Sequence, residues 1–505
     1  DLVLSEMFKQ ERITEEEYNT AKAEVVEFLP QSRFSIKAPH FVFYVREYLE
    51  QKYGADVVES GGLRVITTLD YDLQQKAEEV VYKHAIENEE LWNASNAGLV
   101  AMDPKTGEIL TMVGSRNYFD EEIDGKYNIA TAKRQPGSSF KPFIYVTAMM
   151  KGFTPNSVLF DTKTEFQTTC NPQGRAISGG QGDCYSPSNY DDVYKGPVTL
   201  RQALGESRNI PAVKLLYLTT INDALKTAKN MGIKTLSDAN QYGLTLVLGG
   251  GEVTLLDMTS AYSVFATEGV RHEPVSILRV EDSNGNVLEE HKASGGQVVI
   301  EANSARIISD MLKDNEARTP LFGANSFLNF GSTDVAGKTG TTNNNKDAWM
   351  MGYTPNIVVG VWSGNNDNTP MKKGSAISGR LWREFMDFAL TKVGRDSFTP
   401  PFINESLELK PILRGNWLGG ESVLIDSISE RLATEFTPEE TLEEMTVTDV
   451  HNELHWIDRA NPTGPNPENP GGRQHENWEY AVQNWWNLNK SRFNSVDEGD
   501  LPTVY

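Results

Sequence analysis

Short apolar segments typical of β-strands open the first half of the chain. Residues 63–69 alternate between apolar and polar side chains, which predicts one strand. Residues 98–102 and 108–113 are two apolar runs, and the turn sequence Asp103-Pro104-Lys105-Thr106-Gly107 joins them. This arrangement predicts a β-hairpin at the start of the main domain.

Apolar residues at helical spacing dominate the region from about residue 138 to residue 312, and further strands follow from residue 275 onward. The pattern predicts helices at about 71–89, 199–205, 210–219 and 252–268, and strands at 275–280, 333–342 and 357–362. A helix-rich block between the outer strands of a single antiparallel sheet predicts an α+β fold.

The first 60 residues are polar and helical. Thr14 and Glu17 predict a capping box, and residues 41–49 predict a second, amphipathic helix. Two such helices cannot form a core of their own, so residues 1–60 are interpreted as the end of an N-terminal domain plus connecting helices. The chain starts at Asp1 without a methionine, and we therefore expect it to be a fragment of a longer protein.

The composition changes beyond about Pro400, and residues 461–472 are rich in proline, asparagine and glycine, which predicts a loop. Apolar side chains then recur at helical spacing: Trp478, Val482 and Trp485, with Trp486 beside them. Such an aromatic face can stack on sugar rings, but more often it docks a helix on its own protein, and we favour docking.

The net charge of the chain excludes some classes of binding partner. The formal charge of −23 and the pI near 4.8 argue against a nucleic-acid-binding protein and against a polybasic membrane anchor. No apolar run approaches the roughly 20 residues of a membrane-spanning helix, and no signal peptide is recognised. Any membrane anchor is therefore expected to lie outside this sequence.

Two cysteines, Cys170 and Cys184, lie in one loop rich in glycine, asparagine and aspartate. A local disulfide between them would suit an oxidising, extracytoplasmic setting. Two unpaired thiols are the alternative, and spacing alone does not decide between these states.

A serine and a lysine stand three residues apart where a glycine-containing turn enters a predicted helix, in the segment 135–143. At that spacing Ser138 and Lys141 face the same side of the first helical turn, where Pro142 is tolerated. This arrangement gives a nucleophile, an amine able to take its proton, and a helix N-terminus that favours negative charge. A Ser-x-x-Lys motif alone carries little weight, because short motifs recur by chance.

Two further short motifs follow in order. Ser207-Arg208-Asn209 lies between two predicted helices, and Lys338-Thr339-Gly340-Thr341-Thr342 lies in a predicted strand. Taken singly, they would be a helix cap and an exposed strand lysine. Another Lys-Thr-Gly, at residues 105–107, precedes Ser138 and falls in the hairpin turn. We exclude it, because the motif needs a strand whose backbone can lie alongside a substrate.

The three motifs together predict acyl transfer through a serine. Ser138 needs a base to take its proton, and Lys141 can act as that base only when its amine is neutral. Burial and a second cation nearby, for which Lys338 is the candidate, lower the pKa of Lys141. Ser207 is placed to bridge the two amines and to relay a proton to the leaving group.

Substrate contacts are predicted around these groups. Asn209 carries both a donor and an acceptor, which suits the orientation of a substrate amide. The backbone N–H groups of Ser138 and Thr341 are expected to hold the oxyanion, and hydroxyls beside Lys338 suit a carboxylate. The predicted substrate-binding residues are Thr339, Gly340, Thr341 and Thr342.

Ser-x-x-Lys, Ser-x-Asn and Lys-Thr-Gly in this order form the motif set of penicillin-binding proteins and class A β-lactamases. Additional segments resemble the transpeptidase domain of class A penicillin-binding proteins: residues 134–138, 185–191, 249–254 and 347–355, with 61–70 similar to the connector before it. The resemblance covers about residues 10–390. It implies the penicillin-binding/β-lactamase-like α+β fold, an antiparallel sheet flanked by helices with an all-α subdomain.

The resemblance also implies four parts. Residues 1–60 resemble the end of a glycosyltransferase domain and its connector helices, 61–95 an interdomain linker, and 96–395 the transpeptidase domain. Residues 396–505 form a C-terminal extension without a role that we can assign. Proteins of this class are bifunctional and also polymerise glycan, but no glycosyltransferase motif is recognised here. We therefore expect cross-linking without polymerisation.

The function implied by the resemblance is that of a peptidoglycan D,D-transpeptidase. Its substrates would be stem peptides ending in D-Ala-D-Ala, and Ser138 would form the acyl-enzyme, release D-alanine and pass the acyl group to a neighbouring stem. β-Lactams would acylate the same serine. No cofactor is expected, and the place of action would be the outer face of the bacterial cytoplasmic membrane.

Three rival functions share the motifs. A β-lactamase would need a base for hydrolysis, and no equivalent of the class A glutamate is identified. A D,D-carboxypeptidase would differ only in using water as the acyl acceptor, and a β-lactam sensor would acylate without turnover. The similarity of the first residues to a glycosyltransferase domain argues for a biosynthetic protein over a sensor.

One further pattern resembles a metal site. The segment His451-Asn452-Glu453-Leu454-His455 spaces two histidines one helical turn apart, as in zinc proteases. Glu453 is not where the His-Glu-x-x-His motif requires its glutamate, and no third ligand is evident. The sequence therefore predicts no metal site.

Overall fold

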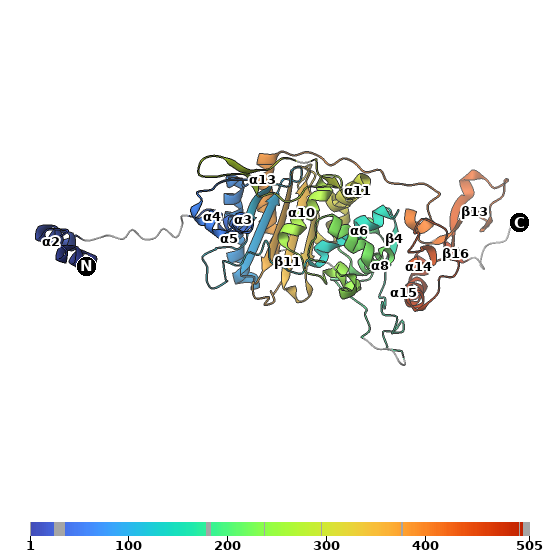
Figure 1. The fold of residues 1–505 in the computed structure, drawn as a ribbon. Helices are drawn as coiled ribbons and strands as arrows, with labels where there is room; N and C mark the ends of the chain where they lie inside the picture. The colour runs from blue at the N-terminus through green and yellow to red at the C-terminus, as the bar shows by residue number, and fades with distance from the viewer. Residues whose placement is uncertain are drawn as a thin grey trace.

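A five-stranded antiparallel sheet forms the centre of the molecule in the computed structural model, which describes residues 2–24, 36–177, 183–236, 238–293, 295–374, 377–493 and 495–497 (Figure 1). The strand order is β10-β11-β12-β2-β3. The strands are β10 (Ala336–Thr341), β11 (Asp347–Thr354), β12 (Ile357–Gly364), β2 (Asn96–Met102) and β3 (Ile109–Val113). The predicted hairpin at residues 98–113 is confirmed as β2 and β3, and the α+β class is confirmed.

Helices cover both faces of this sheet. α10 (Leu255–Ala266) packs on one face, and α5 (Tyr71–Trp92) and α13 (Ile377–Val393) pack on the other. Successive side chains of β2 therefore enter different cores: Val100 joins the α10 side, whereas Leu99 joins the side of α5 and α13. Burial on both faces explains why these strands read as continuous apolar runs.

Two glycines allow the helices to approach the strands closely. A Cβ added to Gly360 in β12 would lie 2.3 Å from Oγ1 of Thr259 in α10. A Cβ added to Gly352 in β11 would lie 2.2 Å from the ring of Trp382 in α13. At these two positions the helix side chain contacts the strand backbone directly, so each helix lies close to the sheet.

A helical subdomain adjoins the sheet at the β10 edge. Its helices are α6 (Lys141–Met150), α7 (Leu200–Gly205), α8 (Asn209–Thr219), α9 (Ile221–Asn230) and α11 (Ala302–Lys313). In α6 and α8 nearly every side chain is buried, because other helices surround them. The start of each of these two helices carries one of the sequence motifs.

The expectation of a single antiparallel sheet was wrong. The strand predicted at 275–280 is β7 (Ile277–Glu281), which pairs with β1 (Arg64–Thr67) and β8 (Val287–Glu290) in a separate sheet. β11 takes the place next to β10 and had not been predicted. All eight residues of β11 are buried, so it shows no alternation that would mark it as a strand.

The first helices agree with prediction. Thr14 caps α2 (Glu15–Ala23) with a complete capping box, in which Glu17 N donates to Thr14 Oγ1 and Thr14 N donates to the Glu17 carboxylate. The second predicted helix is α3 (Pro39–Tyr53), and it buries Phe41 against the main core. α5 lies in the segment expected to be a linker, yet it forms one layer of the main domain.

The C-terminal extension packs against the helical subdomain (Figure 1). α15 (Arg473–Asn489) buries Trp478, Val482 and Trp486, and the Trp478 ring lies 5.3 Å from the Tyr217 ring of α8. This confirms the prediction that the aromatic face docks a helix on its own protein. The extension also holds a small sheet and one short helix: β13 (Gly419–Asp426), β14 (Arg431–Leu432), β15 (Leu442–Thr448), β16 (Ser495–Asp497) and α14 (Glu453–Trp456).

Shorter elements complete the chain. These are α1 (Leu2–Lys9), α4 (Ala55–Ser60), β4 (Val158–Asp161), β5 (Gly196–Thr199), β6 (Val270–Arg271), β9 (Gln297–Val298) and α12 (Asn315–Phe322). The 3-10 helices are η1 (Gly137–Phe140), η2 (Ala239–Gln241), η3 (Leu244–Leu248), η4 (Asn343–Asn345), η5 (Pro411–Arg414), η6 (Glu439–Thr441) and η7 (Lys490–Arg492).

Two general features bear on the setting of the protein. Cys170 and Cys184 form a disulfide with a Cα–Cα distance of 5.7 Å, which decides between the two states that the sequence left open. No helix in the described ranges combines the length and apolar character needed to cross a membrane.

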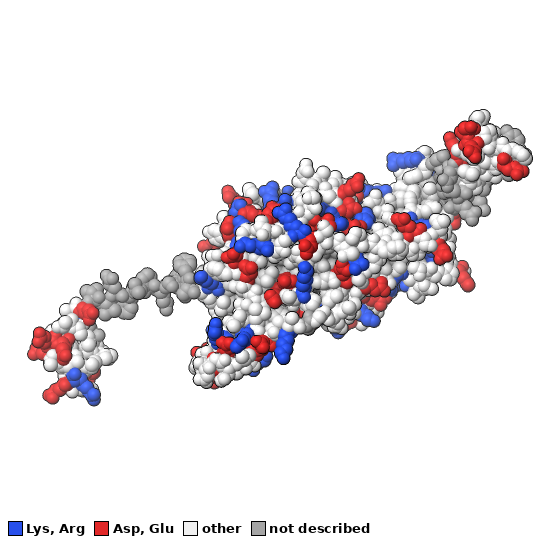
Figure 2. Space-filling model, turned by 90° about the horizontal axis from the view of Figure 1, so that it is seen from above, with Lys and Arg blue, Asp and Glu red and all other residues white. Residues whose placement is uncertain are grey.

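Acidic and basic side chains are interspersed over the central body on the face that Figure 2 draws.

Candidate active site

A cleft of about 680 Å³ lies between the edge strand β10 and the helical subdomain. It collects residues from all three sequence motifs, which are more than 190 positions apart at their extremes. The predicted site residues that line it are Ser138, Ser207, Asn209, Thr339, Thr341 and Thr342. The predicted lysines, Lys141 and Lys338, are buried behind this wall.

The turn that carries Ser138 packs directly on the backbone of β10. Gly137 has a φ of +55°, and a Cβ there would lie 2.4 Å from the Thr341 carbonyl oxygen. A Cβ on Gly340 would in turn lie 2.2 Å from the Pro136 carbonyl oxygen. Only glycine allows this close approach, which brings the half-buried Ser138 next to the edge strand.

Two buried aromatic side chains hold the same turn in place. Tyr262 Oη donates to the Ser139 carbonyl oxygen at 2.6 Å, and Trp349 Nε1 donates to the Gln135 carbonyl oxygen at 2.8 Å. Ser138 itself lies in the 3-10 turn η1 that runs into α6, rather than within the α-helix. Sequence reasoning gave neither residue a supporting role: Trp349 lies in the segment 347–355 noted for its resemblance, and nothing local distinguishes Tyr262 from other core aromatics.

Lys141 is fully buried, and its amine points toward the Ser207–Asn209 segment. Lys141 Nζ donates to Ser207 O at 2.6 Å, Asn209 Oδ1 at 2.9 Å and Arg208 O at 3.1 Å, and lies 3.4 Å from Ser207 Oγ. Among the hydrogen bonds of the described residues, none joins Ser138 Oγ to Lys141 Nζ. The amine of Lys141 is therefore bonded to the Ser207–Asn209 segment rather than to the hydroxyl of Ser138.

Burial is the main reason why the pKa of Lys141 lies well below its ordinary value, and the charge of Lys338 is the second. The sequence argument had named both causes. Burial also lowers the pKa of Lys338, to about 7. A neutral Lys141 donates only two hydrogen bonds, so one of its three close oxygen contacts is released and a lone pair becomes free.

Ser207 lies between the two amines. Its Oγ accepts a hydrogen bond from Lys338 Nζ at 2.8 Å and from Lys141 Nζ at 3.4 Å. Its φ of +55° is rare for a residue other than glycine, and such strain persists where the surroundings enforce it. The bridging position expected for Ser207 is thus the geometry observed.

Asn209 is the first residue of α8, and its backbone is held by residues to which the sequence argument gave no role. Its backbone N–H donates to Asn189 Oδ1 at 2.8 Å, and Asn189 Nδ2 donates to Asp161 Oδ1 at 2.7 Å. Burial raises the pKa of Asp161, whose side chain is entirely shielded from solvent. Asn189 lies in a segment noted for its resemblance, but no sequence signal marks Asp161.

The Lys-Thr-Gly strand is β10, at the edge of the sheet. Lys338 Nζ also donates to Thr339 O at 3.0 Å. Thr342 differs from its neighbours because its hydroxyl is 3.2 Å from Asp347 Oδ2 and accepts from Asp347 N at 2.9 Å. Its hydroxyl is therefore engaged in the β10–β11 turn, although Thr342 lines the cleft together with Thr339 and Thr341.

The chain belongs to the penicillin-binding protein transpeptidase family. The family description "Penicillin binding protein transpeptidase domain" matches residues 97–387, which hold all the motifs of the cleft. A peptidoglycan transpeptidase or a closely related activity follows from this membership.

Named relatives agree with this assignment. Penicillin-binding protein 2D of Bacillus subtilis (strain 168) is 33% identical over 407 residues, which cover 78% of this chain and 55% of the relative. Penicillin-binding protein 1A of Neisseria flavescens is 34% identical over 300 residues, covering 58% of this chain and 35% of the relative. The chain thus spans between about a third and about half of these curated relatives.

Solved structures share the fold. Penicillin-binding protein 1A from Haemophilus influenzae has a TM-score of 0.65 at 22% identity and covers 89% of this chain and 82% of its own. PonA1 from Mycobacterium tuberculosis, solved in complex with penicillin V, has a TM-score of 0.59 at 25% identity and covers 73% of this chain and 97% of its own.

Proposed function

We propose that this chain is a serine D,D-transpeptidase that cross-links peptidoglycan stem peptides ending in D-Ala-D-Ala. One observation carries the proposal: Ser207 Oγ lies between two buried lysine amines at the wall of the cleft that also exposes Ser138. Two buried amines of lowered pKa with a hydroxyl between them form a path for a proton.

Acylation would begin with attack of Ser138 Oγ on the carbonyl carbon of the penultimate D-alanine. Lys141, neutral through burial, would take the hydroxyl proton, and backbone N–H groups of Ser138 and Thr341 would hold the oxyanion. The C–N bond then breaks, and the proton passes through Ser207 to the amine of the departing D-alanine. The products are an ester on Ser138 and free D-alanine.

Transfer would reverse these roles. An amine on a neighbouring stem attacks the ester, loses a proton to Lys141, and forms a new amide while Ser138 regains its hydrogen. Before acylation, the hydroxyls of Thr339 and Thr341, beside the charge of Lys338, would hold the terminal carboxylate of the donor, and Asn209 would orient its amide. The backbone of Gly340, on the edge strand, would lie alongside the substrate.

β-Lactams would acylate the same serine. A relative of this fold has been solved with penicillin V, which supports β-lactam binding in this cleft. The disulfide between Cys170 and Cys184 supports an extracytoplasmic place of action. The domain scheme proposed with this function keeps residues 96–395 as the transpeptidase domain and 396–505 as its extension, and α5, from the segment before residue 96, adds one layer to that domain.

Covalent labelling with a fluorescent penicillin tests the proposal. We expect the wild-type chain to label and Ser138→Ala to remain unlabelled. Ser139→Ala is the matched control, because the Ser139 hydroxyl donates to the Pro136 carbonyl oxygen at 2.7 Å within the protein. Label on Ser138→Ala would overturn the assignment of the nucleophile.

The fate of the acyl group separates the rival activities. A transpeptidase retains the penicillin label and forms a new amide when a D-Ala-D-Ala peptide and an acceptor amine are supplied together. Release of D-alanine without amide formation would indicate a carboxypeptidase, and rapid loss of label would indicate a β-lactamase. Stable label without any peptide turnover would indicate a sensor.

A further inference from the structure

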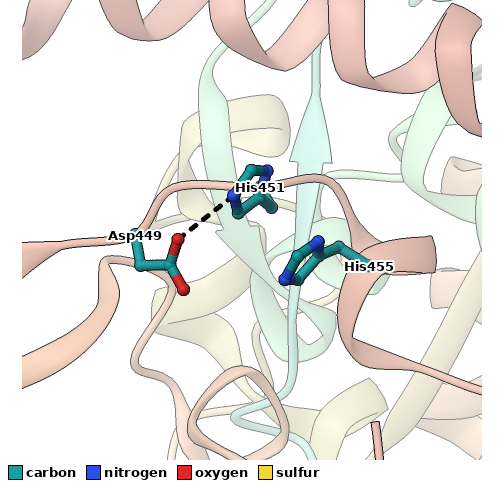
Figure 3. Close-up of side chains that lie close together, drawn as sticks. All are labelled: Asp449, His451 and His455. Carbon is teal, nitrogen blue, oxygen red and sulfur yellow. Dashed lines mark ion pairs between the residues drawn. The ribbon is translucent and has the colours of Figure 1, made fainter. Parts of the chain in front are cut away.

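A second group of chemically active side chains lies in the C-terminal extension, away from the cleft. Asp449 and His451 follow β15, and His455 lies on α14 (Figure 3). One ligand atom from each of these three residues lies within 4.8 Å of the others. Figure 3 shows both imidazole rings beside the Asp449 carboxylate.

A fourth residue fixes the orientation of one ring. His451 Nδ1 is 2.8 Å from Glu479 Oε1 of α15, and His451 Nε2 is 3.1 Å from Asp449 Oδ1. Glu479 is itself held, because Asn452 N donates to its Oε2 at 3.0 Å and Asn452 Nδ2 donates at 2.6 Å. A carboxylate that accepts from one nitrogen of a histidine leaves the other nitrogen free for a metal, as in known metal sites.

The donor set and its spacing suit zinc. Two imidazoles and one carboxylate are ligands that zinc prefers, and bonds of about 2.1 Å place tetrahedral ligand atoms about 3.4 Å apart. The Asp449–His451 pair is already at 3.1 Å, and all three ligand atoms lie within 4.8 Å of one another, so closing the set around an ion requires these half-exposed side chains to draw together. Their exposure leaves the fourth position to water.

We propose that Asp449, His451 and His455 bind a divalent transition-metal ion of the zinc class. The sequence argument predicted no metal here because it found no third ligand and because Glu453 is misplaced for a peptidase. The structure supplies Asp449 as a third ligand candidate, two residues before His451. It also turns Glu453 inward, where both of its carboxylate oxygens contact Lys214, so Glu453 is not placed to act as a general base beside the ion.

Glu453 explains what such an ion would stabilise. It lies between the two histidines in the chain, and both of its carboxylate oxygens are 3.0 Å from Nζ of the buried Lys214 in α8. A metal that fixes His451 and His455 therefore fixes the short helix that carries the partner of Lys214. The ion would fasten the extension to the subdomain that carries Asn209.

Zinc titration of the tag-free, chelator-treated chain tests the proposal. We expect one bound Zn²⁺ per chain by calorimetry, together with a rise in Tm on adding Zn²⁺ but not on adding Mg²⁺. His455→Ala and Asp449→Asn should each weaken zinc binding at least tenfold and abolish the rise in Tm. His291→Ala, which removes a histidine outside the group, should leave both unchanged.

The alternative is that these residues form only ion pairs within the extension, which join the segment after β15 to α15. In that case zinc would not bind stoichiometrically, or His455→Ala and Asp449→Asn would bind it as tightly as the wild type. Either result would overturn the proposal. Penicillin labelling of each variant checks that it has folded, and His451→Ala is avoided as the sole test because it also breaks the contact with Glu479.

Discussion

Glu453 of α14 and Lys214 of α8 form an ion pair in which neither side chain is exposed to solvent. We predict that Glu453→Gln strongly destabilises the protein. The glutamine retains a carbonyl oxygen for the Phe160 N–H group, which now donates to Glu453 Oε1 at 2.5 Å. The substitution therefore removes the charge and one of the two oxygens that accept from Lys214 Nζ, and it keeps the shape of the side chain.

The expected loss is about 3–5 kcal/mol of unfolding free energy, because removing one member of a buried pair leaves an uncompensated charge. Burial already lowers the pKa of Lys214, and the charge of Glu453 opposes that effect. Without Glu453 the pKa of Lys214 falls further. Above this lowered folded pKa the variant carries a neutral lysine in the folded state. Each additional unit by which the pKa falls costs about 1.4 kcal/mol, and the full cost is reached at pH values below the folded pKa.

This origin makes the loss depend on pH. A lysine whose folded pKa is depressed binds fewer protons in the folded state than in the unfolded state. The unfolding free energy therefore rises with pH between the folded pKa and the unfolded value of about 10.4. The deficit of Glu453→Gln relative to the wild type should be largest below the folded pKa of Lys214 and should shrink as the pH approaches 10.

Urea unfolding followed by tryptophan fluorescence at several pH values measures this deficit. Asp223→Asn is the matched control, since it removes the acid from the partly exposed Lys151–Asp223 pair and should cost less than about 1 kcal/mol. Lys214→Met combined with Glu453→Gln should recover much of the loss, because no buried charge is left unpaired and the glutamine oxygen still accepts from Phe160 N. A deficit below about 1 kcal/mol for Glu453→Gln, or one that does not vary with pH, would refute the reasoning.

Three further predictions concern the cleft and the disulfide. Ser207→Gly should raise the unfolding free energy by up to about 1 kcal/mol, because glycine relieves the positive φ. The same change should lower the rate of penicillin acylation, because it removes the hydroxyl between the two amines. Urea unfolding measures the first effect, and stopped-flow labelling measures the second. The kcat/KM for a D-Ala-D-Ala peptide should fall at low pH, because Lys141 becomes protonated. It should also fall above about pH 7, because Lys338 loses the charge that attracts the substrate carboxylate. A pH–rate profile without the fall at high pH would contradict this role of Lys338. Cys170→Ser should cost about 3 kcal/mol, as expected for a closed loop of this size, and an unchanged Tm under oxidising conditions would contradict this.

Local chemistry made part of the fold predictable. The capping box of Thr14 and Glu17 depends on residues three apart, and the hairpin of β2 and β3 depends on a five-residue turn between two apolar runs. No local sequence pattern predicts which strands pair when they are far apart in the chain. β1 and β7 are paired although more than 200 residues separate them, and the fully buried β11 shows no alternation at all.

The same distinction applies to the cleft. Ser138, Ser207 and Lys338 were predicted because each belongs to a short motif in a recognisable local setting. The two Lys-Thr-Gly tripeptides were separated in this way, since Gly107 closes a turn with a φ of +79° whereas Gly340 lies within β10. Asp161 could not be found, because its role depends on a contact with Asn189 that only the folded chain creates.

The extension shows why such contacts matter for function. α8 begins at Asn209, whose amide oxygen meets Lys141, and it places Lys214 about one and a half turns later. Glu453 thus holds the helix whose first residue, Asn209, lines the cleft. Because a helix of eleven residues moves as a unit, a change at Lys214 shifts Asn209 as well. Residues beyond the matched family range therefore belong to the physical support of the cleft.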